Sequence, residues 1–66
     1  MNKIKFVRKY KMFNSTWYDV IYYSGRIYTI AEEDLPGTAR KFVDSATKTE
    51  ERYSKCFKRD ETIYTA

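Results

Sequence analysis

The feature that most constrains the fold is an alternation of side-chain types between Lys3 and Met12. Even positions carry Ile4, Phe6, Tyr10 and Met12, whereas odd positions carry Lys3, Lys5, Lys9 and Lys11. Successive side chains of a β-strand point to opposite faces, so this segment predicts a strand with one apolar face and a row of ammonium groups on the other. A helix would scatter both sets around its surface, and the period itself therefore favours a strand.

Two further strands are predicted after this one. Residues 14–16 (Asn-Ser-Thr) are turn formers, and residues 17–23 are rich in aromatic and β-branched side chains. The dipeptide at 24–25 (Ser-Gly) interrupts the run as a tight hairpin turn would, because glycine tolerates a positive φ. With a third strand over residues 26–31, residues 1–31 are expected to form a three-stranded antiparallel β-meander.

The length of the first hairpin loop decides which side chains share a face. A three-residue loop pairs Tyr10 with Val20, and a two-residue second turn pairs Tyr22 with Ile27. One face then holds the mainly apolar set Ile4, Phe6, Tyr10, Met12, Tyr18, Val20, Tyr22, Ile27 and Ala31. The other face holds Lys5, Val7, Lys9, Lys11, Phe13, Trp17, Asp19, Ile21, Tyr23, Arg26, Tyr28 and Ile30. A two-residue first loop instead moves the first strand onto the opposite face.

A C-terminal helix is predicted over residues 38–59. Thr38 suits the N-cap position, and three oppositely charged i,i+4 pairs support one continuous helix. An apolar stripe at helical spacing is formed by Ala39, Phe42, Val43, Ala46, Tyr53 and Phe57. A capping-box pattern that begins at Thr47 leaves a break at that point open. Residues 60–66 are left open between a tail and a short edge strand.

These elements make one small α+β domain over residues 1–66, in which a three-stranded antiparallel β-meander packs against one C-terminal α-helix. A domain of this length buries only about 60% of the surface of its unfolded chain. Seven Tyr, four Phe and one Trp compensate with large apolar side chains. Two glycines and one proline are too few for a disordered chain, so a compact fold is expected.

The sequence also indicates where the protein resides. Cys56 is the only cysteine, so no intramolecular disulfide can form and the small secreted disulfide scaffolds are excluded. No apolar secretory segment follows the basic N-terminus, and the longest apolar run, residues 20–23, is far too short to span a membrane. We therefore expect a cytoplasmic protein that makes no membrane contact.

Catalysis is not expected from this composition. Histidine is absent, which removes the commonest general base and most zinc sites, and a single cysteine builds no thiolate cluster. Cys56 is interpreted as an inert thiol, and the acidic run at 32–34 as a solvated loop rather than a magnesium site. Both glycines stand alone, so there is no Gly-rich phosphate loop. We predict a non-enzymatic protein without cofactor, metal or small-molecule substrate.

Positive charge lies mainly in the N-terminal half of the chain, whose formal net charge is +4 overall. Residues 1–30 hold six basic groups against one acid, Asp19. Basic strands interleaved with aromatic rings are typical of proteins that bind single-stranded nucleic acid. The candidate binding residues are Lys3, Lys5, Lys9, Lys11, Trp17, Tyr23, Arg26 and Tyr28, with Phe13 as a further stacking ring. The expected partner is nucleic acid or a nucleic-acid-bound complex, although lysines on an exposed strand also serve to prevent edge aggregation.

A protein partner explains the same face in another way. One helix cannot cover both sides of a sheet, and large apolar patches rimmed by charge usually mark protein interfaces. The face would then form a homodimer around Trp17 and Ile21, or dock on an acidic host protein. Very short, Lys- and Tyr-rich chains with few cysteines resemble the small accessory proteins of bacteriophages, and this resemblance implies inhibition of a host enzyme or defence complex by binding.

Overall fold

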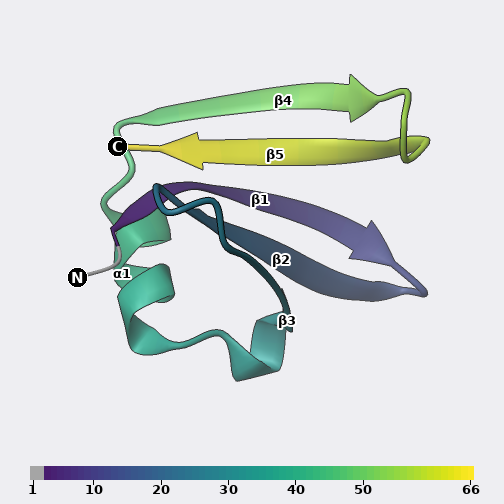
Figure 1. Cartoon of the computed structure of the whole chain (residues 1–66). Coiled ribbons are helices and arrows are strands. Elements are labelled where there is room, and N and C mark those ends of the chain that lie inside the picture. The colour runs from purple at the N-terminus through teal and green to yellow at the C-terminus, as the bar shows by residue number, and fades with distance from the viewer. Residues whose placement is uncertain (1–2) are drawn as a thin grey trace.

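A computed structural model describes residues 3–66 and shows a five-stranded antiparallel sheet with one short α-helix (Figure 1). In chain order the elements are β1 (Ile4–Met12), β2 (Ser15–Tyr22), β3 (Ile27–Ala31), the 3-10 turn η1 (Glu32–Asp34), α1 (Gly37–Asp44), β4 (Lys48–Ser54) and β5 (Arg59–Thr65). The strands lie in the order β3-β2-β1-β5-β4, so the last strand of the chain is placed between the first strand and β4.

The first hairpin has a two-residue loop, which reverses the predicted facing of β1. Phe13 and Asn14 form the loop with φ values of 53° and 62°, and Met12 pairs with Ser15. Two consecutive positive φ values define the type I′ turn, whose twist matches that of the flanking strands. Tyr10 consequently pairs with Trp17 rather than with Val20. The assignment that placed Tyr10 and Val20 on one face is wrong, because the loop is one residue shorter than assumed.

The helix covers one face of the sheet, which we call the helix face. Buried Val7, Tyr18 and Val20 pack there against Ala39 of α1. Ile4, Tyr22, Ile30, Leu35, Phe42, Val43 and Tyr64 surround this core. The register of β1 shifts between Ile4 and Phe6, and this irregularity allows both Ile4 and Val7 to join the helix side. The opposite side, which we call the open face, carries Tyr10, Trp17 and their cross-strand neighbours.

The second hairpin turn is longer than predicted. Ile21 pairs with Ile27, and the Tyr22 N–H donates to the Arg26 carbonyl at 2.9 Å, so three residues form the loop. Gly25 closes it with φ of 94°, the position at which a three-residue hairpin turn requires a left-handed residue. The predicted pairing of Tyr22 with Ile27 is therefore wrong by one residue.

Helix α1 ends at Asp44, so the predicted helix over 38–59 is wrong. Pro36, rather than Thr38, occupies the N-cap position, and Ser45 ends the helix by donating its hydroxyl to the Lys41 carbonyl at 2.6 Å. The residues that follow include two β-branched threonines, Thr47 and Thr49, which have mediocre helix propensity. Eight residues make α1 far too short to cross a bilayer, and no other α-helix occurs in residues 3–66.

The C-terminal third of the chain is a β-hairpin rather than a helix and tail. Residues of β4 pair with β5 from Lys48 opposite Thr65 to Ser54 opposite Arg59. β5 also pairs with β1, and its Ile63 is 6% exposed. The α+β prediction of a three-stranded meander with a C-terminal helix is thus wrong: the fold is predominantly β, and the segment 60–66 is an inner strand.

Ile63→Ala tests the inner position of β5. Removing this buried side chain leaves a cavity beside β1, and we expect the free energy of unfolding to fall by about 2–5 kcal/mol in urea denaturation. Ile27→Ala is the matched control, because Ile27 is 58% exposed and its truncation is expected to cost less than about 0.5 kcal/mol in dilute solution. Equal stabilities of the two variants would contradict the placement of β5.

Candidate binding surface

The sheet separates the predicted lysine row from the predicted tryptophan. Lys9 and Lys11 lie on the helix face, where Lys9 pairs with Tyr18 and holds its ammonium 5.9 Å from the ring centroid. Trp17 lies on the open face opposite Tyr10. The indole nitrogen of Trp17 is buried and has no hydrogen-bond partner within residues 3–66. Trp17 and these two lysines therefore cannot contact one ligand strand from the same face.

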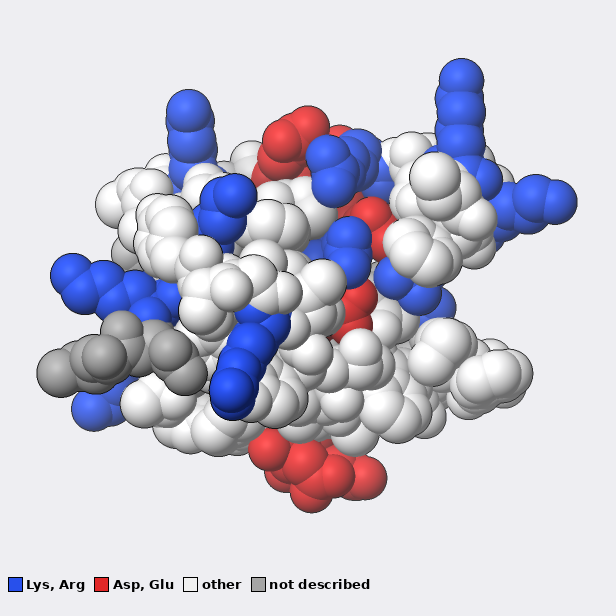
Figure 2. Space-filling view, viewed as in Figure 1, with Lys and Arg blue, Asp and Glu red and all other residues white. Residues whose placement is uncertain are grey.

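The other five predicted residues lie toward the end of the sheet at which β1 begins. The Tyr23 N–H donates to the Lys3 carbonyl at 3.0 Å, and Lys5 occupies the irregular part of β1. Arg26 Nη1 donates to the Tyr28 hydroxyl at 3.3 Å. The eight predicted residues thus form separate groups rather than one continuous basic surface. Figure 2 shows the same separation, since basic side chains project from several separate places on the face in view.

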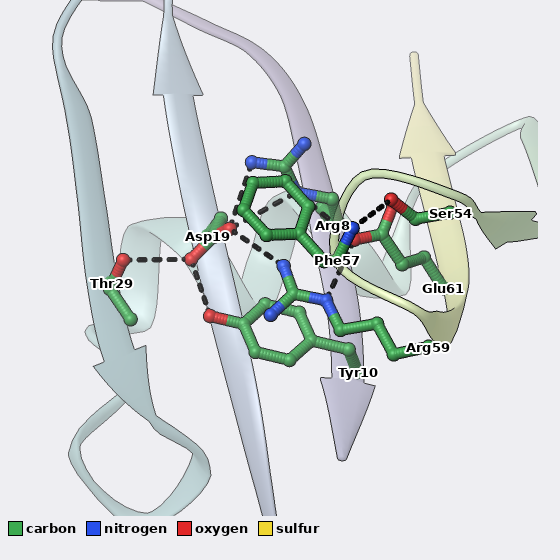
Figure 3. A network of polar contacts seen from close by, with 8 residues as sticks. All are labelled: Arg8, Tyr10, Asp19, Thr29, Ser54, Phe57, Arg59 and Glu61. Atoms are coloured by element: carbon green, nitrogen blue, oxygen red, sulfur yellow. Dashed lines mark hydrogen bonds and ion pairs between the residues drawn. The ribbon is translucent and has the colours of Figure 1, made fainter. Parts of the chain in front are cut away.

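A buried carboxylate organises the open face (Figure 3). Asp19 on β2 is 4% exposed, and Arg8 Nε donates to its Oδ2 at 3.0 Å. The hydroxyls of Tyr10 and Thr29 each donate to Oδ1 at 2.8 Å. Since these donors come from β1 on one side of Asp19 and from β3 on the other, the carboxylate joins the three N-terminal strands.

Arg59 connects this cluster to the C-terminal hairpin. Its Nε donates to Glu61 at 2.8 Å, and its Nη2 lies 3.8 Å from Asp19 Oδ2. The guanidinium is stacked between two rings, with Cζ 3.5 Å from the Tyr10 centroid and 4.4 Å from the Phe57 centroid (Figure 3). Phe57 belongs to the loop between β4 and β5, which therefore folds back over the open face.

The charges of this cluster, which we call the open-face network, are balanced. Arg8 and Arg59 face Asp19 and Glu61, and both carboxylates are almost fully buried. Buried charges are tolerated only when they are paired, and the stacking of guanidinium on aromatic rings adds to the attraction. The two arginines therefore stabilise the sheet and position Phe57, and they are not available as free cations for a partner.

Free cations and exposed rings gather instead at the end of the sheet where β1 ends and β5 begins. Both loops found there lie at the same end in Figure 1. The first loop contains Phe13, which follows Lys11 and Met12 at the end of β1, and the second contains Lys55, Phe57 and Lys58; we call Lys11 and these four residues the loop end. Neither loop contains an acidic residue. In Figure 2 this end of the molecule shows basic and uncharged atoms without acidic ones.

Phe13 occupies an unfavourable position in two respects. Its side chain is 87% exposed, and its backbone lies in the left-handed region, which bulky residues rarely adopt. Asparagine or glycine is the usual residue at this place in a type I′ turn. Neither packing nor turn geometry explains a phenylalanine here, and such strain is typical of positions that contact a partner.

A cleft on the helix face lies over β5, between β4 and β1. Its walls include Lys9 and Lys11 on one side, and Glu51, Tyr53 and Asp60 on the other. Within the described part of the chain, neither lysine forms an ion pair with these carboxylates. The carboxylates make the cleft less suited to a polyanion than the loop end is.

Sequence reasoning missed Lys55, Phe57 and Lys58 because it placed them on a helix. A signal was present, since the triplets Lys-Met-Phe at 11–13 and Lys-Cys-Phe at 55–57 are similar. The first triplet runs from the end of β1 into its loop and the second lies in the loop between β4 and β5, so their likeness has a meaning only when both are known to lie at one end of a sheet.

Other chemistry is sparse on this surface. No group of three or more potential metal-ligating side chains occurs in residues 3–66, and Cys56 is exposed in the loop between β4 and β5. Comparison with known proteins finds no matching family model, no matching curated protein and no matching solved structure.

Asp19→Asn tests the open-face network. Removing one partner of a buried ion pair leaves uncompensated charge, here one excess positive charge because Arg8 and Arg59 then share only Glu61, and we expect a loss of about 3–5 kcal/mol in the free energy of unfolding. The exposed Glu33→Gln variant removes the same charge and is expected to change stability by less than about 0.5 kcal/mol. A loss below about 1 kcal/mol for Asp19→Asn would contradict the role given to this carboxylate.

Tyr10 is expected to make the protein sensitive to alkali. Burial raises the pKa of Tyr10 above its usual value, and the hydrogen bond to Asp19 adds to the shift. The unfolded tyrosine ionises near its usual pKa of about 10 while folded Tyr10 keeps its proton. The stability that this shift contributes is complete below about pH 10 and is lost as the pH rises towards the folded pKa.

Urea denaturation at increasing pH measures this loss. Tyr10→Phe is expected to flatten the decline in stability above about pH 10, whereas Tyr23→Phe, which removes a 69% exposed phenol, is expected to leave it unchanged. An unaltered decline in Tyr10→Phe would rule out Tyr10 as its cause.

Proposed function

We propose that this protein is a small non-catalytic binding module that engages single-stranded nucleic acid, or a complex containing it, through the loop end. Lys55 and Lys58 in one loop, and Lys11 near the end of β1, supply three ammonium groups for phosphates. Because Lys11 lies on the helix face and the loop between β4 and β5 folds over the open face, the bound strand would pass around this end of the sheet. Phe13 and Phe57 supply exposed rings for stacking on bases, since every base has a π-face and stacking tolerates any sequence.

Phe57 suits this role because its ring is held in place before a partner arrives. It lies over the guanidiniums of Arg8 and Arg59, with its centroid 5.8 Å and 4.4 Å from their Cζ atoms, and it remains 58% exposed. The Phe57 N–H also donates to the Ser54 hydroxyl at 3.2 Å. A ring fixed in this way loses little conformational freedom on binding.

The observation that carries the proposal is the strained, exposed Phe13. A phenylalanine with φ of 53° costs backbone energy and gains nothing from burial. Replacement of Phe13 by Asn is expected to raise the free energy of unfolding by about 1 kcal/mol, because Asn adopts the left-handed backbone conformation with less strain than Phe. The same replacement is expected to weaken nucleic-acid binding by about 1–3 kcal/mol, as lost stacking does. Higher stability with lower affinity is the signature of a residue retained for binding.

Salt dependence tests the lysines of the loop end. Fluorescence anisotropy with labelled single-stranded DNA and RNA of mixed sequence gives affinity as a function of salt. Each phosphate contact on a single strand contributes about 0.7 to the slope of log affinity against log salt, so replacing Lys11, Lys55 and Lys58 by Gln is expected to flatten it by about two units.

The control replaces Lys3, Lys5 and Lys48, which lie at the opposite end of the sheet, by Gln. It removes the same charge and is expected to leave the slope nearly unchanged. An equal effect of both triple variants would show a diffuse field rather than a site at the loop end. Absence of binding by the unaltered protein at low salt would refute the proposal and favour an acidic protein as partner, as an inhibitor of a host complex would require.

A further inference from the structure

The two edge strands of the sheet differ in how they are protected. β4 carries Lys48, Glu50, Glu51 and Arg52, all exposed, and charges of this kind prevent an edge from pairing with another strand. β3 has no charged residue, and its Ile27 and Tyr28 are 58% and 44% exposed. The β4 edge is therefore protected against pairing with a further strand, whereas the β3 edge is not.

The backbone of β3 has free groups on its outer side. The Tyr22 N–H bonds to the Arg26 carbonyl, which directs the backbone groups of Arg26 toward β2. Because the direction alternates along an antiparallel strand, those of Ile27, Thr29 and Ala31 point outward. Within residues 3–66 no strand pairs with this side. A partner strand centred on Thr29 would meet every outward group of β3.

We propose that β3 pairs with β3 of a second copy of this chain, antiparallel and about a two-fold axis at Thr29, which joins two sheets into one. Thr29 then faces Thr29 of the partner subunit, and Ile27 faces Ala31 of the partner subunit. Tyr28 faces Ile30 of the partner subunit, so the exposed apolar side chains gain cover. An interface of this kind is self-complementary, as a two-fold dimer requires.

Charge complementarity favours a second copy of this chain as the partner of β3, and it also favours this register. Arg26 precedes β3, and Glu32 follows it as the first residue of η1; both are exposed. The Tyr18 hydroxyl donates to Glu32 Oε2 at 3.4 Å, which leaves the other carboxylate oxygen for a partner. In the register centred on Thr29, Arg26 lies opposite Glu32 of the partner subunit, and symmetry repeats the contact. Glu33 and Asp34 extend the negative end, so each end of β3 meets the opposite charge. Unlike charges placed face to face fix both register and partner.

This interface replaces the homodimer expected around Trp17 and Ile21. Ile21 is 8% exposed within the sheet, and the indole nitrogen of Trp17 is shielded from solvent. The unprotected apolar edge lies at β3 instead. The dimer is independent of the proposed nucleic-acid binding, since β3 and the loop end share no residue.

Sedimentation of single and mixed charge variants tests the proposal. Arg26→Glu and Glu32→Arg each place like charges opposite one another twice, and each is expected to raise the dimer dissociation constant by about tenfold or more. An equimolar mixture of the two variants has unlike charges at both contacts, and it is expected to restore the dimer. Lys48→Glu changes the charge of the β4 edge by the same amount as Arg26→Glu changes that of the β3 edge, and it is expected to leave the dimer unchanged. Arg26 and Lys48 are exposed, so thermal melts of Arg26→Glu and Lys48→Glu at low concentration are expected to match the unaltered protein. Glu32→Arg also removes the acceptor of the Tyr18 hydroxyl, and restoration of the dimer in the mixture shows that this variant is folded.

Three outcomes would overturn the proposal. The unaltered protein would be a monomer at concentrations of several hundred micromolar. Arg26→Glu would dimerise as strongly as Lys48→Glu, which would place the contact elsewhere. The mixture of Arg26→Glu and Glu32→Arg would remain monomeric although each variant had lost the dimer, which would exclude the register centred on Thr29.

Discussion

The ionic network around Asp19 is the interaction on which the rest of the structure depends. Its carboxylate accepts hydrogen bonds from Arg8 and Tyr10 on β1 and from Thr29 on β3, and Arg59 brings β5 to the same group. Residues 3–66 contain a single short α-helix, which gives apolar cover to one face of the sheet only. On the open face, paired charges and stacked rings take the place of a second apolar layer.

The same network also positions Phe57, a residue of the proposed binding surface at the loop end. Arg59 is neutralised by the buried carboxylates, and its flat guanidinium carries the ring of Phe57 on one side and that of Tyr10 on the other. The loop between β4 and β5 is thereby held beside the end of β1. These contacts give the exposed ring of Phe57 a defined position, at the same end of the sheet as the strained Phe13.

Local patterns predicted the first half of the fold better than the second. Alternation and turn residues located the three N-terminal strands, but one residue of loop length at Phe13 and Asn14 decided which face of β1 lies inward. The segment 48–54 carries charges that suit either a helix or an edge strand. Only its pairing with β5, a contact set by tertiary structure, makes it a strand. Lys55, Phe57 and Lys58 of the loop end were missed for that reason, since Phe57 was assigned to a helical stripe, whereas Lys11 and Phe13 were already candidates.

Native-state hydrogen exchange tests most directly whether the Asp19 network joins the C-terminal hairpin to the N-terminal strands. The β5 amides that bond to β1 are expected to exchange with the same free energy as the amides between β1 and β2, because the network makes these strands one cooperative unit. Exchange of the β5 amides at a much lower free energy, while those of β1 and β2 stay protected, would show that the hairpin opens independently and would contradict this central role of Asp19.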